Sequence, residues 1–171
     1  MKMFLKILTG NLVLRKGPQD FPFSMVLMKL CLMAYFITGL PGLMATASFE
    51  VAVFAMVLDT LVLLVFAYLC LQAFGKSARF VQTVIALASC GAVFQLIVLP
   101  LLYSLPAEPE VSEALFGISL MLLVFVSWNL AVYAHIFRES FNVRLASAMA
   151  LTVCYIVMTV VVRKLLFPEL E

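Results

Sequence analysis

Long apolar stretches without a single Asp, Glu, Lys or Arg dominate the chain. A helix needs about 20 predominantly apolar residues to cross the roughly 30 Å hydrocarbon layer of a membrane. Asp59 shortens one stretch, because it interrupts an apolar run that begins near Val51. The pattern predicts five membrane-spanning segments, whose uncharged parts are residues 30–49, 60–75, 80–107, 114–137 and 145–162.

The spans are expected to be helices rather than strands. Strands of a membrane β-barrel alternate apolar and polar residues, whereas these stretches are apolar on every side. With 65% hydrophobic and 12% charged residues in 171, the chain lies far from soluble proteins, where about half of the residues are apolar and about a quarter charged. The predicted fold is an all-α integral membrane bundle of five transmembrane helices, preceded by a short amphipathic interfacial helix.

Residues 1–24 form a segment expected on the cytoplasmic side. On a helical wheel Lys2 and Lys6 lie opposite Ile7 and Leu8, which is typical of a helix lying on a membrane surface. A turn containing two prolines follows. The basic side of this helix is suited to anionic lipid, so membrane lipids are the first expected partners.

Capping and helix-breaking residues set the expected helix limits. Ser24 and Ser48 can cap the helices that follow them, while Pro168 stops the last one. Pro41 either ends the first span or kinks it. The helices are expected at about residues 25–40, 49–74, 80–103, 112–137 and 144–167, giving a membrane domain at 25–167 and an external tail at 168–171.

Basic residues predict the orientation, because cytoplasmic loops carry the excess of Lys and Arg. Only Arg163 and Lys164 fall on the opposite side, next to an acidic loop at 108–113 that lacks basic residues. We therefore expect a cytoplasmic N-terminus and an external C-terminus, in the inner (cytoplasmic) membrane of a bacterium. The residues on the expected inside are Lys2, Lys6, Arg15, Lys16, Lys29, Lys76, Arg79, Arg138 and Arg144.

Asp59 is the first candidate functional residue. It lies about ten residues into its helix, and therefore about 15 Å deep. A carboxylate there is costly unless it is protonated or hydrogen-bonded. Gln95 lies at a comparable depth, after a face of small residues that includes Gly91, and it is a plausible partner; Asn129 is a third candidate. The carboxyl group either serves as a proton or cation site or fixes the helix packing.

A second candidate site is expected at the cytoplasmic face. His135, Arg138 and Glu139 share one helix face with Trp128, because their spacings match the helical repeat. His135 can titrate near neutral pH. His135 lies within a turn of the helix end. The alternative interpretation is therefore that it is a residue of the membrane boundary without a function.

Motifs for enzyme or cofactor chemistry are not found in the sequence. The four cysteines, Cys31, Cys70, Cys90 and Cys154, lie in different apolar segments without a CxxC pair, which argues against a zinc or redox site. One histidine cannot form a histidine cluster, and no serine-hydrolase, zinc-protease or phosphate-loop motif occurs. We expect no catalytic residue, no metal, no cofactor and no nucleic-acid partner.

The layout of a cytoplasmic N-terminal segment followed by five closely spaced helices resembles that of Yip1-type membrane proteins, including small bacterial relatives. The segment at 17–22, GPQDFP, is similar to the start of uncharacterised bacterial membrane proteins. The resemblance covers most of the chain and implies a five-helix membrane domain. It transfers no functional residue.

Three functions remain open. The first is a non-enzymatic scaffold, assembly or interaction subunit that packs against lipids, a membrane protein partner or a second copy. The second is a small transporter or channel component that uses Asp59. The third is an intramembrane enzyme, which would need a polar cavity joining His135, Arg138 and Glu139.

Overall fold

The computed structural model describes residues 2–104 and 113–167, without the side chains of residues 113–115. The expected external tail at 168–171 and most of the acidic loop lie outside the described residues.

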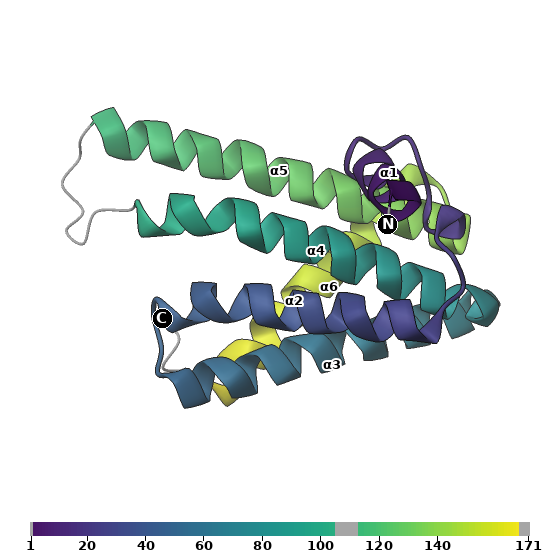
Figure 1. Ribbon diagram of the computed structural model, residues 1–171, viewed down its shortest axis with the longest axis horizontal. Helices are drawn as coiled ribbons and strands as arrows, with labels where there is room; N and C mark the ends of the chain where they lie inside the picture. Colours follow the sequence, from purple (N-terminus) through teal and green to yellow (C-terminus); the bar gives the residue numbers. More distant parts are fainter. Residues whose placement is uncertain (1, 105–112, 168–171) are drawn as a thin grey trace.

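Helices make up almost all of the described chain (Figure 1). Five of them are long and apolar enough to cross a membrane, and a short helix precedes them, so the predicted fold class is confirmed for the described residues. The chain is an integral membrane protein by this criterion. The elements are α1 (Lys2–Leu12), η1 (Pro18–Asp20), α2 (Met25–Met44), α3 (Phe49–Ala73), η2 (Ser77–Arg79), α4 (Phe80–Tyr103), α5 (Glu113–Phe141) and α6 (Leu145–Leu166).

The helix α4 is the centre of the bundle, since it contacts α1, α2, α3 and α5 and is the most buried of the spans. Figure 1 shows α5 beside α4, α2 beside α3, and α6 running obliquely behind them. The short α1 lies across one end of the bundle, next to the turn between α5 and α6. We call this end the α1 end.

The helix α2 continues through Pro41 to Met44 instead of ending near residue 40. Proline lacks the N–H group of a regular helix and disturbs the local hydrogen bonding. Tyr103 of α4 donates its hydroxyl hydrogen to the carbonyl oxygen of Pro41 at 3.1 Å. This contact joins α4 to α2 beside the proline.

The helix α5 is also longer than expected and ends at Phe141. Ser140 is fully buried and accepts a hydrogen bond from Thr83 of α4 at 3.0 Å, which ties this last turn to the bundle. Asn142 then adopts the left-handed conformation with a φ of 56°. That conformation ends the helix, because it is common directly after a helix C-terminus.

The small-residue face of α4 points into the bundle. Ala88 is fully buried, and Gly91 lies against the ring of Tyr35 from α2 and the hydroxyl group of Tyr133 from α5. A Cβ atom at Gly91 would approach the Tyr35 ring to 2.7 Å. Only glycine therefore lets α2, α4 and α5 approach this closely.

We predict that Gly91→Ala destabilises the bundle, because overpacking a filled site costs about 1–3 kcal/mol. Gly117→Ala on α5 is the matched control, since a Cβ there meets nothing within 4 Å. That substitution should be neutral or stabilising by about 1 kcal/mol, because alanine favours helix over glycine. Unfolding in mixed detergent micelles measures both, and equal effects would contradict the packing role of Gly91.

Candidate functional site

Asp59 points into the bundle from α3, and only 6% of it is exposed. It belongs to the buried stripe of α3, in which Ala52, Met56 and Leu63 recur at helical spacing. The side chain is therefore surrounded by protein rather than by lipid. A carboxylate at such a position requires a partner within the fold.

Arg163 of α6 is that partner. Its NH2 group donates a hydrogen bond to Oδ2 of Asp59, and the two side chains form a salt bridge. The exposed side-chain fraction is 32% for Arg163 and 8% for Asp59, so the arginine covers the carboxylate from the outside of the bundle. The oblique path of α6 brings Arg163 to this position, although the residue is only three positions from the end of the helix at Leu166.

The expected partners of Asp59 lie elsewhere. Gln95 is half-buried on α4 and accepts a hydrogen bond from Thr38 of α2 at 2.6 Å. Asn129 is half-buried on α5, and its side chain makes no hydrogen bond within the described residues. The structure thus pairs Asp59 with Arg163, and uses Gln95 to join α4 to α2.

Three buried tyrosines lie near Asp59. Tyr35, Tyr133 and Tyr155 come from α2, α5 and α6, and each is at most 7% exposed. The rings of Tyr133 and Tyr155 have centroids 6.0 Å apart, and Asp59 lies within electrostatic range of all three side chains. Sequence reasoning missed this cluster, because the three tyrosines lie in different helices.

Sequence reasoning also missed the role of Arg163. One signal was present: Arg163 lies on the side that should carry few basic residues, while an unpaired acid lies within another span. Opposite charges in two apolar segments favour a pair, because an ion pair is far less costly in an apolar environment than two separate charges. The pair was missed because its two residues lie far apart in the sequence.

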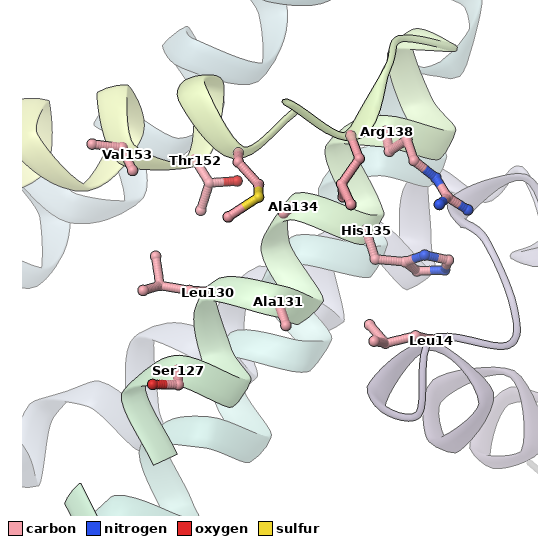
Figure 2. Close-up of a pocket in the computed structure, with 11 residues that line it drawn as sticks. Leu14, Ser127, Leu130, Ala131, Ala134, His135, Arg138, Thr152 and Val153 are labelled. Atoms are coloured by element: carbon pink, nitrogen blue, oxygen red, sulfur yellow. The ribbon is translucent and has the colours of Figure 1, made fainter. Parts of the chain in front are cut away.

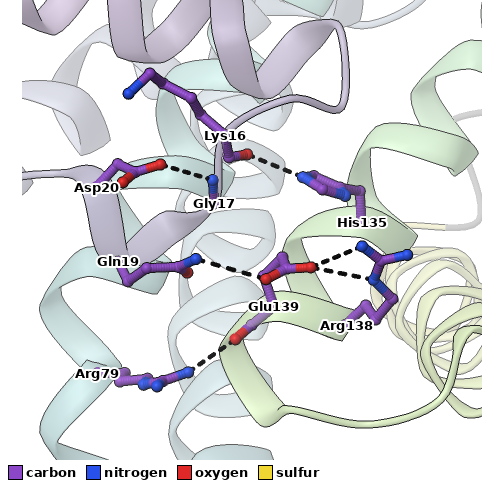
Figure 3. Close-up of polar contacts among 8 residues, drawn as sticks. All are labelled: Lys16, Gly17, Gln19, Asp20, Arg79, His135, Arg138 and Glu139. Carbon is purple, nitrogen blue, oxygen red and sulfur yellow. Dashed lines mark hydrogen bonds and ion pairs between the residues drawn. The ribbon is translucent and has the colours of Figure 1, made fainter.

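The second candidate site lies at the α1 end, where the structure brings His135, Arg138 and Glu139 together with the N-terminal segment (Figure 3). Nε2 of His135 lies 2.9 Å from the carbonyl oxygen of Lys16. A carbonyl group only accepts, so this nitrogen carries the hydrogen. Oε2 of Glu139 accepts from Gln19 at 3.5 Å.

Glu139 connects several segments at this end. Its Oε1 accepts from Nε and NH2 of Arg138 at 3.1 and 2.7 Å. Its backbone carbonyl accepts from NH1 of Arg79 at 2.8 Å (Figure 3). His135 and Glu139 therefore connect the end of α5 to the chain that follows α1 and to Arg79 before α4, while Arg138 pairs with Glu139 on α5 itself.

The helix α1 is docked on the bundle by its apolar side. Ile7 and Leu8 are buried, and so is Asn11, whose amide group donates to the carbonyl oxygen of Gly17 at 3.5 Å. Trp128 of α5 donates from its ring nitrogen to the carbonyl oxygen of Leu12 at 2.9 Å. The side expected to face the membrane therefore packs largely on protein.

The turn after α1 is fixed by polar contacts. Oδ2 of Asp20 accepts from the backbone N–H of Gly17 at 3.0 Å. Nε2 of Gln82 on α4 donates to the carbonyl oxygens of Gln19 and Phe21 at 3.2 and 2.7 Å. The side chain of Gln82 thus attaches the N-terminal segment through its backbone. These bonds satisfy carbonyl groups that would otherwise lack a partner at the membrane boundary.

A pocket of about 520 Å³ lies between α5 and α6, near the α1 end (Figure 2). His135 and Arg138 line it, but Glu139 does not, and most of its lining is apolar. The hydroxyl groups of Ser127 and Thr152 in its lining donate to carbonyl oxygens of their own helices, at Leu123 and Ala148. Within the described residues, no group of three or more His, Cys, Asp or Glu side chains could hold a metal ion.

Comparisons with protein-family models, curated proteins and solved structures give no match. The resemblance noted from the sequence is therefore supported only at the level of a bundle with five apolar helices.

We predict that removing one charge of the Asp59 pair is strongly destabilising, by about 3–5 kcal/mol, because the other charge is left buried and unpaired. Asp59→Leu and Arg163→Met should each show this loss. The double variant should recover most of it, and unfolding in mixed micelles measures all three. If the double variant shows the sum of the single losses, the two residues do not stabilise the fold as a pair.

The control is the pair of Arg138 and Glu139, which is more exposed: its side chains are 43% and 30% exposed, against 32% and 8% for Arg163 and Asp59. Such pairs contribute about 0–1 kcal/mol. Arg138→Gln should therefore change stability far less than Arg163→Met.

We also predict that Gln82→Ala loosens the N-terminal segment, because it removes two hydrogen bonds to that backbone, each contributing about 0.5–1.5 kcal/mol. Hydrogen exchange of residues 2–21 should become faster while that of α3 stays unchanged. Gln72→Ala is the matched control, since Gln72 is exposed at the end of α3. Equal exchange in both variants would contradict the docking.

Proposed function

We propose that the protein is a non-enzymatic membrane scaffold or interaction subunit that assembles with lipids or with a second membrane protein chain. The observation that carries the proposal is the pairing of Asp59 with Arg163. A carboxylate that transports a proton or cation must exchange it with water, whereas this one is covered by an arginine from a neighbouring helix. The pair instead connects α3 to α6.

The outer surface supports the same proposal. Large apolar side chains on α5 are mostly exposed, among them Phe116 at 74%, Met121 at 64% and Leu123 at 63%. In water such a surface would be a liability. In a bilayer it contacts lipid tails or another helix, so the described surface is suited to association rather than to solute binding.

The proposal includes an orientation. The N-terminus is cytoplasmic, in the inner membrane of a bacterium, and the layout is like that of Yip1-type proteins. The pairing of Arg163 with Asp59 supports this orientation, because it removes Arg163 from the few basic residues counted on the external side.

The competing function is transport through Asp59. We expect purified full-length protein in liposomes to show no proton or cation flux that depends on Asp59. The measurement compares wild type with Asp59→Asn, using a pH-sensitive dye and a potassium-sensitive dye inside the vesicles. Thr60→Val is the control, since Thr60 is the next residue on α3 and its hydroxyl donates to the carbonyl oxygen of Met56 in its own helix. Flux that is lost in Asp59→Asn and kept in Thr60→Val would overturn the proposal.

The mass of the solubilised protein tests whether it associates with a partner. The protein, solubilised in a mild detergent, should retain a partner: a second copy, another membrane protein or bound lipid molecules. Native mass spectrometry distinguishes these three by mass. A bare monomer without retained lipid would contradict the proposal.

A further inference from the structure

The pocket between α5 and α6 has an apolar interior and a basic end. Ala134 of α5 and Thr152 of α6 are the buried part of its lining, which also includes Ala131 of α5, Met149 and Val153 of α6, and Leu14 after α1. Figure 2 shows the two alanines between the α6 side chains and the pair of Leu14 and His135. Its volume of about 520 Å³ is within the usual range of small-molecule sites, about 300–1,000 Å³.

The exposure of the lining shows where the pocket opens. Ala134 and Thr152 form a buried floor, whereas Ala131, Met149 and Val153 are exposed and form a rim, with Met149 and Val153 exposed by 55% and 53%. The rim belongs to membrane-spanning helices, so the opening faces sideways into the bilayer. A molecule that enters by this route is itself dissolved in the membrane.

One basic residue lines the pocket at the α1 end, and two more lie next to lining residues in the sequence. Arg138 lines it, Arg15 follows the lining residue Leu14, and Arg144 precedes the lining residue Leu145. Arg15 and Arg144 are exposed. Glu139 occupies only the Nε and NH2 side of the Arg138 guanidinium, and NH1 makes no hydrogen bond among the described residues. The end of the pocket therefore retains a positive charge.

We propose that this pocket binds one anionic phospholipid, with an acyl chain between α5 and α6 and the phosphate group at Arg138. Charge and shape both support this occupant. Arginine offers planar N–H donors that match phosphate oxygens, and basic pockets between membrane helices are known to suit anionic headgroups. The apolar part of the pocket accommodates a chain that stays within the hydrocarbon layer.

The bound lipid would also contact the N-terminal segment. His135 lies between the pocket and the Lys16 carbonyl group, to which it donates its hydrogen bond. Leu14, in the left-handed conformation with a φ of 60°, places its side chain against the same pocket. The lipid thus fills a space shared by α5, α6 and the chain that follows α1.

This inference rests on the proposed interaction function and names one ligand of it. The experiment uses full-length protein in detergent, titrated with phosphatidylglycerol or with zwitterionic phosphatidylcholine of identical chains. Native mass spectrometry counts the bound lipid. We expect one tightly held phosphatidylglycerol, with an affinity several-fold higher than that for phosphatidylcholine.

Two variants test the charged end. Arg138→Gln should lower phosphatidylglycerol binding about fivefold, because one basic residue near an anionic headgroup contributes a factor of that order. Lys76→Gln removes a positive charge at the same end of the bundle, between α3 and α4, and should have little effect. Glu139→Gln should raise the affinity, since it leaves the whole guanidinium for the phosphate.

Two further variants test the apolar part of the pocket. Ala131→Phe fills the pocket from an exposed position, so it should displace both lipids without disturbing the core. Leu123→Phe adds an aromatic ring to a lipid-facing site outside the pocket and should displace neither. Circular dichroism first establishes that each variant keeps its helix content. Arg144→Gln replaces Arg138→Gln if the latter fails to fold.

Three outcomes would overturn the proposal. Equal affinity for the two lipids would mean that the basic end selects no headgroup. An equal loss in Lys76→Gln and Arg138→Gln would indicate diffuse surface charge instead of a site. Unchanged lipid binding in Ala131→Phe, together with a loss of dimer mass, would assign the pocket to a second copy. None of these results alters the flux test of Asp59, so the two proposals can fail separately.

Discussion

Inside a bilayer each polar group needs a partner within the protein, and the rest of this structure depends on how that requirement is met for Asp59. The carboxylate lies in the buried stripe of α3, and its partner comes from α6, more than a hundred residues later in the chain. The pair is weak evidence for net stability, because desolvation opposes the attraction. It does constrain how the helices are arranged, since α6 must take an oblique path that brings Arg163 to α3.

The same requirement explains the tight packing around α4. Gln95 joins α4 to α2 through Thr38, and Ser140 joins α5 to α4 through Thr83. Gly91 allows the rings of two tyrosines to reach the region of the ion pair. Without water, packing and hydrogen bonds are the main forces between membrane helices, and the small residues of α4 let both act at short range.

At the α1 end the polar groups serve a different purpose. The side chains of His135 and Gln82 hold backbone carbonyls of the N-terminal segment, and Glu139 links that segment to two helix ends. This contact closes one end of the pocket between α5 and α6. The proposed lipid site therefore depends on the docked N-terminal segment. This dependence connects the segment to the proposed interaction function.

The sequence by itself determined the number, type and approximate limits of the spans, because the absence of charge over about 20 residues is a local property that the bilayer imposes. It also placed His135, Arg138 and Glu139 on one face, since the helical repeat is local as well. Only the tertiary structure decided the partner of Asp59, the burial of Asn11 and the gathering of three tyrosines. These depend on the tilt and contact of helices distant in the chain, and hydropathy is nearly uniform around each span, so no periodic signal in the sequence indicates which face meets which neighbour.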